Sequence, residues 1–157
     1  MAEQNATQPQ FQLQRIFLKD LSYEAPKTPV IFKEQWKPDV NLEINNSANV
    51  VEGDIWEVVV KVTVTVKNGE STAFIVEVAQ AGLFLLQGVE GIQKEAILKG
   101  VCPNILFPYA RETVSDVVSR GTFPQFLLQP INFEAAFAEN LRQQQAKAKA
   151  AEEAAKH

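Results

Sequence analysis

The chain has 157 residues, of which 46% are hydrophobic and 22% charged, so one domain with a sizeable hydrophobic core is expected. A net charge of −4 offers no basic stripe to neutralise phosphates, which argues against nucleic-acid binding. The lone cysteine, Cys102, excludes an intramolecular disulfide framework, and no apolar run approaches the roughly 18 residues of a membrane span, so no membrane insertion is expected.

The N-terminal segment, residues 1–10, is polar and is predicted to be disordered. It has neither the basic nor the apolar region of a signal peptide, so a soluble protein of the reducing cytosol is expected. From Phe11 to Glu24, partial alternation of apolar and polar residues with aromatic and β-branched types predicts a strand.

The next segment, APKTPVIFKEQW (residues 25–36), is called here the first connection. Its prolines predict an extended, irregular course. Ordinary connections are polar because they lie in water, yet this one is studded with large apolar side chains. They are Val30, Ile31, Phe32 and Trp36.

Alternating residues predict three further strands. VNLEI, residues 40–44, reads as a half-buried strand that the polar run NNSAN closes. Residues 55–67 form the clearest strand, with Trp56 and the even-numbered valines on one face, and Asn68-Gly69 then marks a hairpin. In the returning strand the apolar residues again share even numbers. They are Phe74, Val76, Val78, Phe84 and Leu86.

This shared parity constrains the register of the hairpin, because a one-residue slip would exchange the two faces. An odd number of loop residues is therefore expected, for example residues 68–70 with Val66 opposite Thr72. The other face then carries Ile75 and Glu77 among lysines and threonines and is expected to meet solvent. The sheet is predicted to be antiparallel, with one apolar face that needs cover.

Helices are predicted to supply that cover. GVEGIQKEAILKG is consistent with a short helix, and PYARETVSDVVSRG with a longer one that has Pro108 near its first turn and stops at Gly121. Asn132 is a plausible N-cap for a last helix whose apolar row ends at Leu141. Residues 143–157 are then an Ala-rich, charged helix or tail in solvent.

Side chains for catalysis are scarce. The only histidine is the last residue, His157, and no glycine-rich phosphate loop follows a strand. Cys102 is interpreted as a small buried hydrophobe. No enzyme activity, metal or other cofactor is expected. The carboxylates Asp20, Glu24, Glu57 and Glu77 show no ligand spacing and are interpreted as a solvated sheet face.

A second apolar connection, TFPQFLLQPINF (residues 122–133), contains two prolines and six large apolar residues. Both connections are either packing over the core or a surface left accessible for a ligand. Two features favour binding: the last helix has one narrow apolar row and cannot cover both connections, and the two connections flank the sheet and helices that would form the walls and floor of a groove. Aromatic side chains in such proline-stiffened segments also lose little entropy on binding.

Several long motifs are recognisable. CPNILFPYARETVSDVVSRGTFPQF, together with FQLQRIFLKDLSYEAP, FKEQWKP and VVVKVTVTV, closely resembles the SecB protein-export chaperone family, from about Phe11 to Leu141. The resemblance implies an α+β domain over residues 11–142, with a four-stranded antiparallel sheet, helices packed on one face, and a dimer-of-dimers homotetramer. It implies an ATP-independent holdase of the bacterial cytoplasm that binds unfolded preproteins and delivers them to the SecA ATPase.

The resemblance also assigns roles to residues. The SecA-docking positions of the family match Asp20, Glu24, Ile75 and Glu77. The client-binding groove of the family matches Phe32, Trp36, Val40, Leu42, Ile44, Phe123, Pro124, Phe126, Leu127, Phe137 and Leu141. The alternative is a structural or small-ligand-binding α+β domain whose apolar connections are simply buried.

Overall fold

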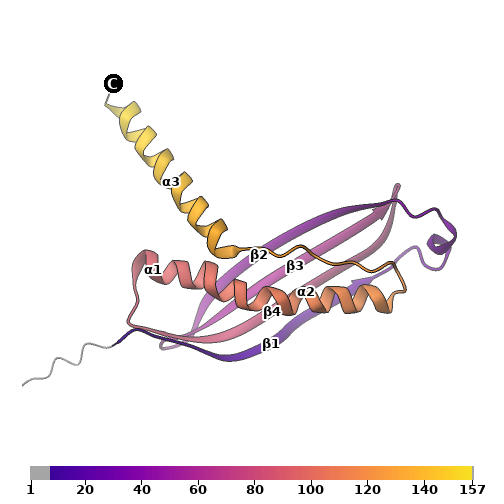
Figure 1. Cartoon of the computed structure of the whole chain (residues 1–157), viewed down its shortest axis with the longest axis horizontal. Coiled ribbons are helices and arrows are strands. Elements are labelled where there is room, and N and C mark those ends of the chain that lie inside the picture. Colours follow the sequence, from indigo (N-terminus) through magenta and orange to yellow (C-terminus); the bar gives the residue numbers. More distant parts are fainter. Residues whose placement is uncertain (1–7, 157) are drawn as a thin grey trace, which may run out of the picture.

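The computed structural model describes residues 8–156 and shows a four-stranded antiparallel sheet with helices on one side, as an α+β fold requires (Figure 1). The order across the sheet is β1-β4-β3-β2, so β1 and β2 are its edges. The strands are β1 (Gln10–Glu24), β2 (Pro38–Glu52), β3 (Ile55–Asn68) and β4 (Ser71–Gln87).

The helical part begins after β4 with three segments that form one interrupted helix. α1 (Gly91–Ala96) passes into a π-helical turn, η2 (Ile97–Val101), and then into α2 (Cys102–Arg120). α2 lies across β4 and β3, whereas α3 (Phe133–Ala155) leaves the body of the molecule (Figure 1). The first connection contains a short 3-10 helix, η1 (Val30–Lys33). None of the described helices is both long and apolar enough to cross a membrane.

The core lies between α2 and the even-numbered face of the two central strands, as the parity argument predicts. Val62 and Val64 of β3 have no exposed surface, and Val114 of α2 packs in the same cluster. Burying each such side chain stabilises the fold by roughly 1.5–3 kcal/mol. Because α2 covers β3 and β4 only, the helix-side faces of both edge strands remain partly open.

The β3–β4 hairpin corrects one predicted detail. Val66 pairs with Phe74, and Lys67 pairs with Thr72, so Ala73 is an extra residue in β4. The turn therefore has two central residues, and Gly69 takes a positive φ of 65°. The predicted three-residue loop, with Val66 opposite Thr72, is wrong. The β-bulge at Ala73 supplies the odd residue that keeps the even-numbered side chains on one face.

Two predicted boundaries were wrong. β2 runs through NNSAN to Glu52, because an edge strand can pair its backbone with β3 while its polar side chains face water. The chain instead reverses at Gly53, where φ is 54°. α2 begins at Cys102, so Pro103 occupies its first turn and Pro108 lies inside the helix.

Candidate functional site

The two connections meet in an aromatic cluster centred on Phe123. The ring centroid of Phe123 lies 4.9 Å from that of Phe74 on β4, 5.4 Å from that of Phe32 and 5.7 Å from that of Trp36. Phe126 adds an edge-on contact with Phe74 at 6.5 Å. Phe123 is buried, so the cluster joins both connections to the core.

Other side chains of the same connections remain in contact with water. Phe32 is 50% exposed and Leu127 is 62% exposed, although Ile31 and Leu128 beside them are buried. A hollow of about 130 Å³ opens between the connections. Its lining includes Ile31, Phe32, Trp36, Phe123 and Pro124. The connections therefore serve both as core packing and as accessible apolar surface.

Polar contacts hold the first connection in place. Asn68, at the end of β3, is buried, and its Oδ1 accepts a hydrogen bond from the backbone N–H of Lys37 at 2.7 Å. Its Nδ2 donates to the carbonyl oxygen of Gln35 at 3.0 Å. The sequence indicated Asn68 only as a turn residue, because a bond to a segment thirty-odd residues away leaves no local pattern.

The start of the second connection is fixed by close packing. A Cβ atom at Gly121 would clash with the Tyr23 hydroxyl of β1, so the absence of a side chain at Gly121 makes room for Tyr23 in its present position. The φ of Gly121 is −76°, a backbone conformation that any residue can adopt. The next residue, Thr122, takes the left-handed φ of 60° that turns the chain back along α2.

An open apolar strip continues from the aromatic cluster along β2. Val40, Leu42 and Ile44 pair with Val66, Val64 and Val62, which places them on the helix side of the sheet. Because α2 does not reach β2, Val40 is 45% exposed and Leu42 is 39% exposed, and Ile44 is half-buried. We define the open strip as these three residues.

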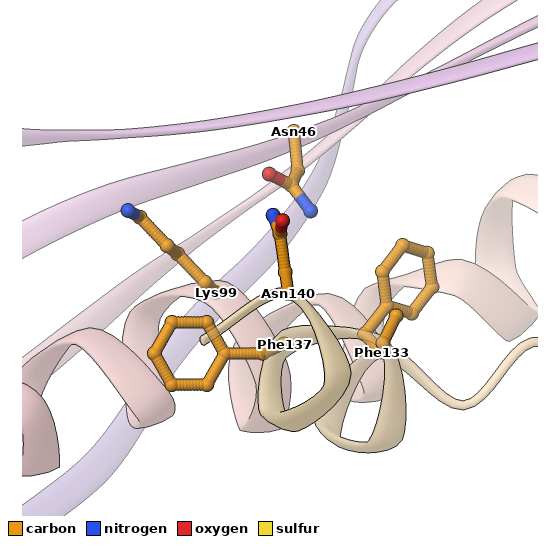
Figure 2. A pocket seen from close by; sticks show the side chains of 6 residues that line it. Asn46, Lys99, Phe133, Phe137 and Asn140 are labelled. Carbon is orange, nitrogen blue, oxygen red and sulfur yellow. The ribbon is translucent and has the colours of Figure 1, made fainter. Parts of the chain in front are cut away.

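Two residues predicted for the groove, Phe137 and Leu141, lie apart from the aromatic cluster. With Ile92 and Ala96 of α1 they line a hollow of about 370 Å³ at the base of α3. Phe137 also borders a smaller hollow of about 150 Å³, where Asn46 of β2 and Asn140 of α3 point toward each other (Figure 2). The predicted groove residues thus form three groups: one at the connections, the open strip of β2, and one at the base of α3.

The base of α3 is tied to the start of α2. Asn132 caps α3 by accepting a hydrogen bond from the N–H of Ala135 at 3.1 Å, as predicted. Asn104 of α2 accepts from the N–H of Phe133 at 2.7 Å. Gly100 allows this approach, because a Cβ atom there would lie 3.1 Å from the Cα of Glu134. No motif in the sequence had marked Asn104 or Gly100.

The outer face of the sheet, which none of the described helices covers, carries the predicted docking residues. Three successive outward-facing pairs join β1 to β4: Glu24 with Ile75, Ser22 with Glu77, and Asp20 with Ala79. Asp20, Glu24, Ile75 and Glu77 therefore lie on one face, over two neighbouring strands. Lys61 of β3 joins them, with its Nζ 2.6 Å from Oε1 of Glu77. This hydrogen bond and the charge of Glu77 raise the pKa of Lys61.

The edge strand β1 presents a second uncovered apolar surface. Two bulges, between Leu13 and Arg15 and between Leu18 and Asp20, keep most of its apolar side chains on the helix side, whereas Phe17 pairs with Ala81 and faces outward. Four of them are exposed by 39–47%: Phe11, Leu13, Leu18 and Leu21. An unpaired edge with such a row is suited to pairing with another chain.

Comparison with known proteins assigns the family. The SecB family model, described as preprotein translocase subunit SecB, matches residues 4–144. A protein-export protein SecB of Pseudomonas fluorescens strain Pf0-1 is 51% identical over 144 residues, covering 92% of this chain and 89% of the relative. The Marinobacter nauticus protein of the same name is 50% identical over 145 residues, covering 92% and 88%.

A solved structure supports the fold. A SecB-like chaperone of Mycobacterium tuberculosis, in complex with a ChAD peptide from an antitoxin, superposes with a TM-score of 0.64. It is 19% identical, and the match covers 77% of this chain and 90% of that one.

Proposed function

Because the chain belongs to the SecB family of protein-export chaperones, we propose that it is an ATP-independent holdase that binds unfolded preproteins and delivers them to SecA. The family is one of chaperones rather than enzymes. The observation that carries the proposal is the apolar surface left open by α2: the exposed side chains of the connections continue into the open strip of β2. Client encounter before export implies a cytoplasmic location.

The physics of this surface favours weak and unselective binding. One client aromatic side chain buries roughly 150–250 Å². At about 25 cal/mol per Å², its burial contributes at most about 4–6 kcal/mol. Ordering of the client chain and loss of its free motion remove much of that gain. A single surface therefore releases its client readily, which suits transfer to a translocation motor.

Assembly would raise the affinity without new contacts. We propose a dimer of dimers in which β1 pairs with its copy and the apolar row of β1 is covered by neighbouring chains. An isologous contact of this kind is the commonest in soluble oligomers. Several surfaces engaged by one long client raise avidity by roughly 10²–10⁴. Native mass measured with and without an unfolded preprotein tests the assembly, and a monomer at working concentration would contradict it.

Client binding is tested by substitution in the aromatic cluster. Trp36→Ala with Phe126→Ala should keep the assembly and weaken calorimetric binding of an unfolded preprotein. A second pair, Phe32→Ser with Leu127→Ser, changes side chains that are at least half exposed, so it removes less core packing than the first pair. Val51→Ala, at the exposed β2–β3 turn, is the matched control. Unchanged affinity in both pairs would refute the proposed surface.

SecA docking is assigned to the outer face. Asp20, Glu24 and Glu77 offer carboxylates around Ile75 to a basic partner. Asp20→Lys or Glu77→Lys should lower SecA affinity at low salt, where such pairs are least screened, while client binding persists. Glu52→Lys, at the far turn of β2, should leave SecA binding unchanged. Equal SecA binding by all variants would show that docking uses another surface.

The burial of Ile31, Phe123 and Leu128 favours the alternative of a structural or small-ligand-binding domain. A holdase suppresses aggregation of a denatured protein near stoichiometric ratio and without nucleotide. A structural domain gives no suppression under the same conditions, and this measurement decides between the two.

A further inference from the structure

A chemically reactive pair of residues lies where the first connection meets the sheet. Asn68-Gly69 is the one Asn-Gly pair in the 157-residue sequence, and it ends β3 and begins the turn to β4. In such a pair the backbone nitrogen of the glycine can attack the side-chain amide of the asparagine, because glycine has no Cβ atom to shield that nitrogen. The structure gives this asparagine a second task, which is to hold the first connection.

The side-chain amide of Asn68 is engaged at both ends. Its Oδ1 accepts from the backbone N–H of Lys37, and its Nδ2 donates to the carbonyl oxygen of Gln35. Its Nδ2 also donates to Oε2 of Glu34 over a longer distance of 3.4 Å. Trp36, which packs against Phe123, lies in sequence between these partners. We call these three hydrogen bonds the Asn68 latch.

The latch opposes the attack in the folded protein. The nitrogen that must leave is Nδ2, the atom that donates to Gln35 and Glu34, so the amide has to give up these partners before it reacts. Gly69 is exposed, and a Cβ atom there would meet no neighbour within 4 Å, so water reaches the turn. The reaction therefore needs local opening of the first connection rather than unfolding of the whole domain.

We propose that Asn68-Gly69 is a self-modification site whose reaction releases the first connection irreversibly. The Gly69 nitrogen forms a bond to Cγ of Asn68 and gives up its proton. The bond from Cγ to Nδ2 breaks, and ammonia leaves. Water then opens the cyclic imide at either of its two carbonyl carbons, which gives aspartate or isoaspartate at position 68. No atom is oxidised or reduced, and water is the co-reactant.

The product is unable to form the latch again. An aspartate keeps one oxygen for the N–H of Lys37, but its second oxygen takes the place of Nδ2. That oxygen faces the carbonyl of Gln35 and the carboxylate of Glu34, two acceptors that have lost their donor. A buried charge without a donor disfavours this arrangement. Isoaspartate also adds a backbone atom beside the pairing of residue 68 with Ser71, which disturbs the turn.

The consequence for client binding rests on the proposed holdase function. The first connection carries Phe32 and Trp36, and both rings pack against Phe123. Release of the connection separates these rings from the aromatic cluster, so the affinity for an unfolded preprotein falls. The modification thus limits the working life of each chain as a holdase.

The chemistry is tested on the full chain at mildly alkaline pH, in water enriched in oxygen-18, with and without urea. Peptide mapping by mass spectrometry follows aspartate and isoaspartate at position 68. Each product should carry one oxygen-18 atom, and the reaction should be at least about tenfold slower in the native protein than in urea. Trp36→Ala, which removes an anchor of the first connection, should raise the native rate. Val51→Ala, at the exposed β2–β3 turn, should leave it unchanged.

The latch is tested with Asn68→Asp in a Trp56→Phe background, where Trp36 is the one remaining tryptophan. The emission of Trp36 should shift to longer wavelength, and acrylamide should quench it more strongly, because the ring leaves the cluster. Adding Glu34→Gln replaces the opposed carboxylate with an amide donor, so part of the docked signal should return. Glu70→Gln, in the exposed turn, removes the same charge and should restore nothing.

The outcomes separate the modification from the function on which its consequence rests. Equal reaction rates in the native protein and in urea, or product without oxygen-18, overturn the modification site. A Trp36 emission that Asn68→Asp leaves unchanged overturns the latch. Failure of the unmodified protein to hold an unfolded preprotein overturns the holdase proposal, whereas the difference in rate and the Trp36 shift would still support the modification site.

Discussion

On the helix side of β3 and β4 most side chains are valine and phenylalanine with almost no exposed surface. On the outer side the same strands carry lysine, threonine and glutamate near their hairpin, and apolar residues such as Val59 and Leu83 toward the other end. Phe74 and Ile75 are neighbours in sequence, yet the first is 1% exposed and contacts Phe123, while the second is half-buried and faces outward. The two faces therefore make very unequal contributions to stability.

The difference shows that the two faces of one sheet can present different chemistry to other molecules. The helix side derives its stability from dense packing, and its apolar surface remains open only at the edges, where α2 ends. The outer side is held by exposed ion pairs, which are worth little energy and tolerate change. Under the proposed function, the client surface and the SecA-docking residues lie on opposite faces of the sheet, which leaves room for both partners at the same time.

The largest effect is expected from Phe74→Ala. Removal of this buried ring should lower the free energy of unfolding by about 3–5 kcal/mol in urea denaturation. Ile75→Ala, one residue away on the outer face, should cost about 1 kcal/mol, the usual loss for a partly exposed site. Equal losses in the two variants would contradict the contrast between the faces.

Gly121→Ala should have the next largest effect. The new Cβ meets the Tyr23 hydroxyl, and overpacking of this kind costs about 1–3 kcal/mol. Tyr23→Phe removes the hydroxyl oxygen, so the double variant should recover part of the loss in a double-mutant cycle. If the stability losses of the two single variants simply add in the double variant, the cost of Gly121→Ala does not come from contact with the Tyr23 hydroxyl.

Cys102 gives a smaller effect that depends on pH. Burial raises the pKa of its thiol from 9.0 to about 12, so the unfolded chain loses the proton first. Stability should therefore be unaffected below pH 9 and should fall as pH rises from about 9 to 12. Between pH 8 and 10 the fall attributable to Cys102 is about 1 kcal/mol. The Cys102→Ala variant should lack this fall in stability. Because Cys102 is buried, a thiol reagent at pH 8 should modify it only after urea has unfolded the protein.

The smallest effect is expected on the outer face, from Lys61→Gln. Since Lys61 is exposed, loss of its pair with Glu77 should hardly move the urea midpoint at neutral pH. Its raised pKa means that the contribution is present below the ordinary lysine pKa and is lost as pH rises above about 10. A large, salt-insensitive loss at pH 7 would show that the outer face matters for folding after all.

The features that could be predicted from sequence are those with a local repeat. The even-numbered valines predicted the core face, because successive side chains of a strand point to opposite faces. Asn132 predicted the start of α3, because an N-cap side chain accepts a hydrogen bond from a backbone N–H only three residues further on. The apolar residues of β1 alternate only partially, because bulges at Gln14 and Lys19 each insert a residue. The pattern thus predicts the strand but conceals which side each residue faces.

The features that escaped prediction depend on distant contacts. Asn68 bonds to the first connection, and Gly100 and Asn104 receive α3, without any local pattern. The groove residues matched by family resemblance lie at the connections, on β2 and at the base of α3. Phe137 and Leu141 line a hollow with Ile92 and Ala96 of α1, because the base of α3 is fixed at the start of α2 by the contacts of Asn104 and Gly100. Their part in client binding remains a proposal.

The narrow attachment of α3 has a practical consequence. The helix touches the rest of the chain near its first turns, and every described residue after Leu141 is exposed (Figure 1). From Arg142 to Ala155 it extends about 20 Å into solvent, at 1.5 Å per residue. A dye or a fused reporter domain attached near the end of α3 would therefore be held away from the sheet and should report on the protein without blocking either face of the sheet.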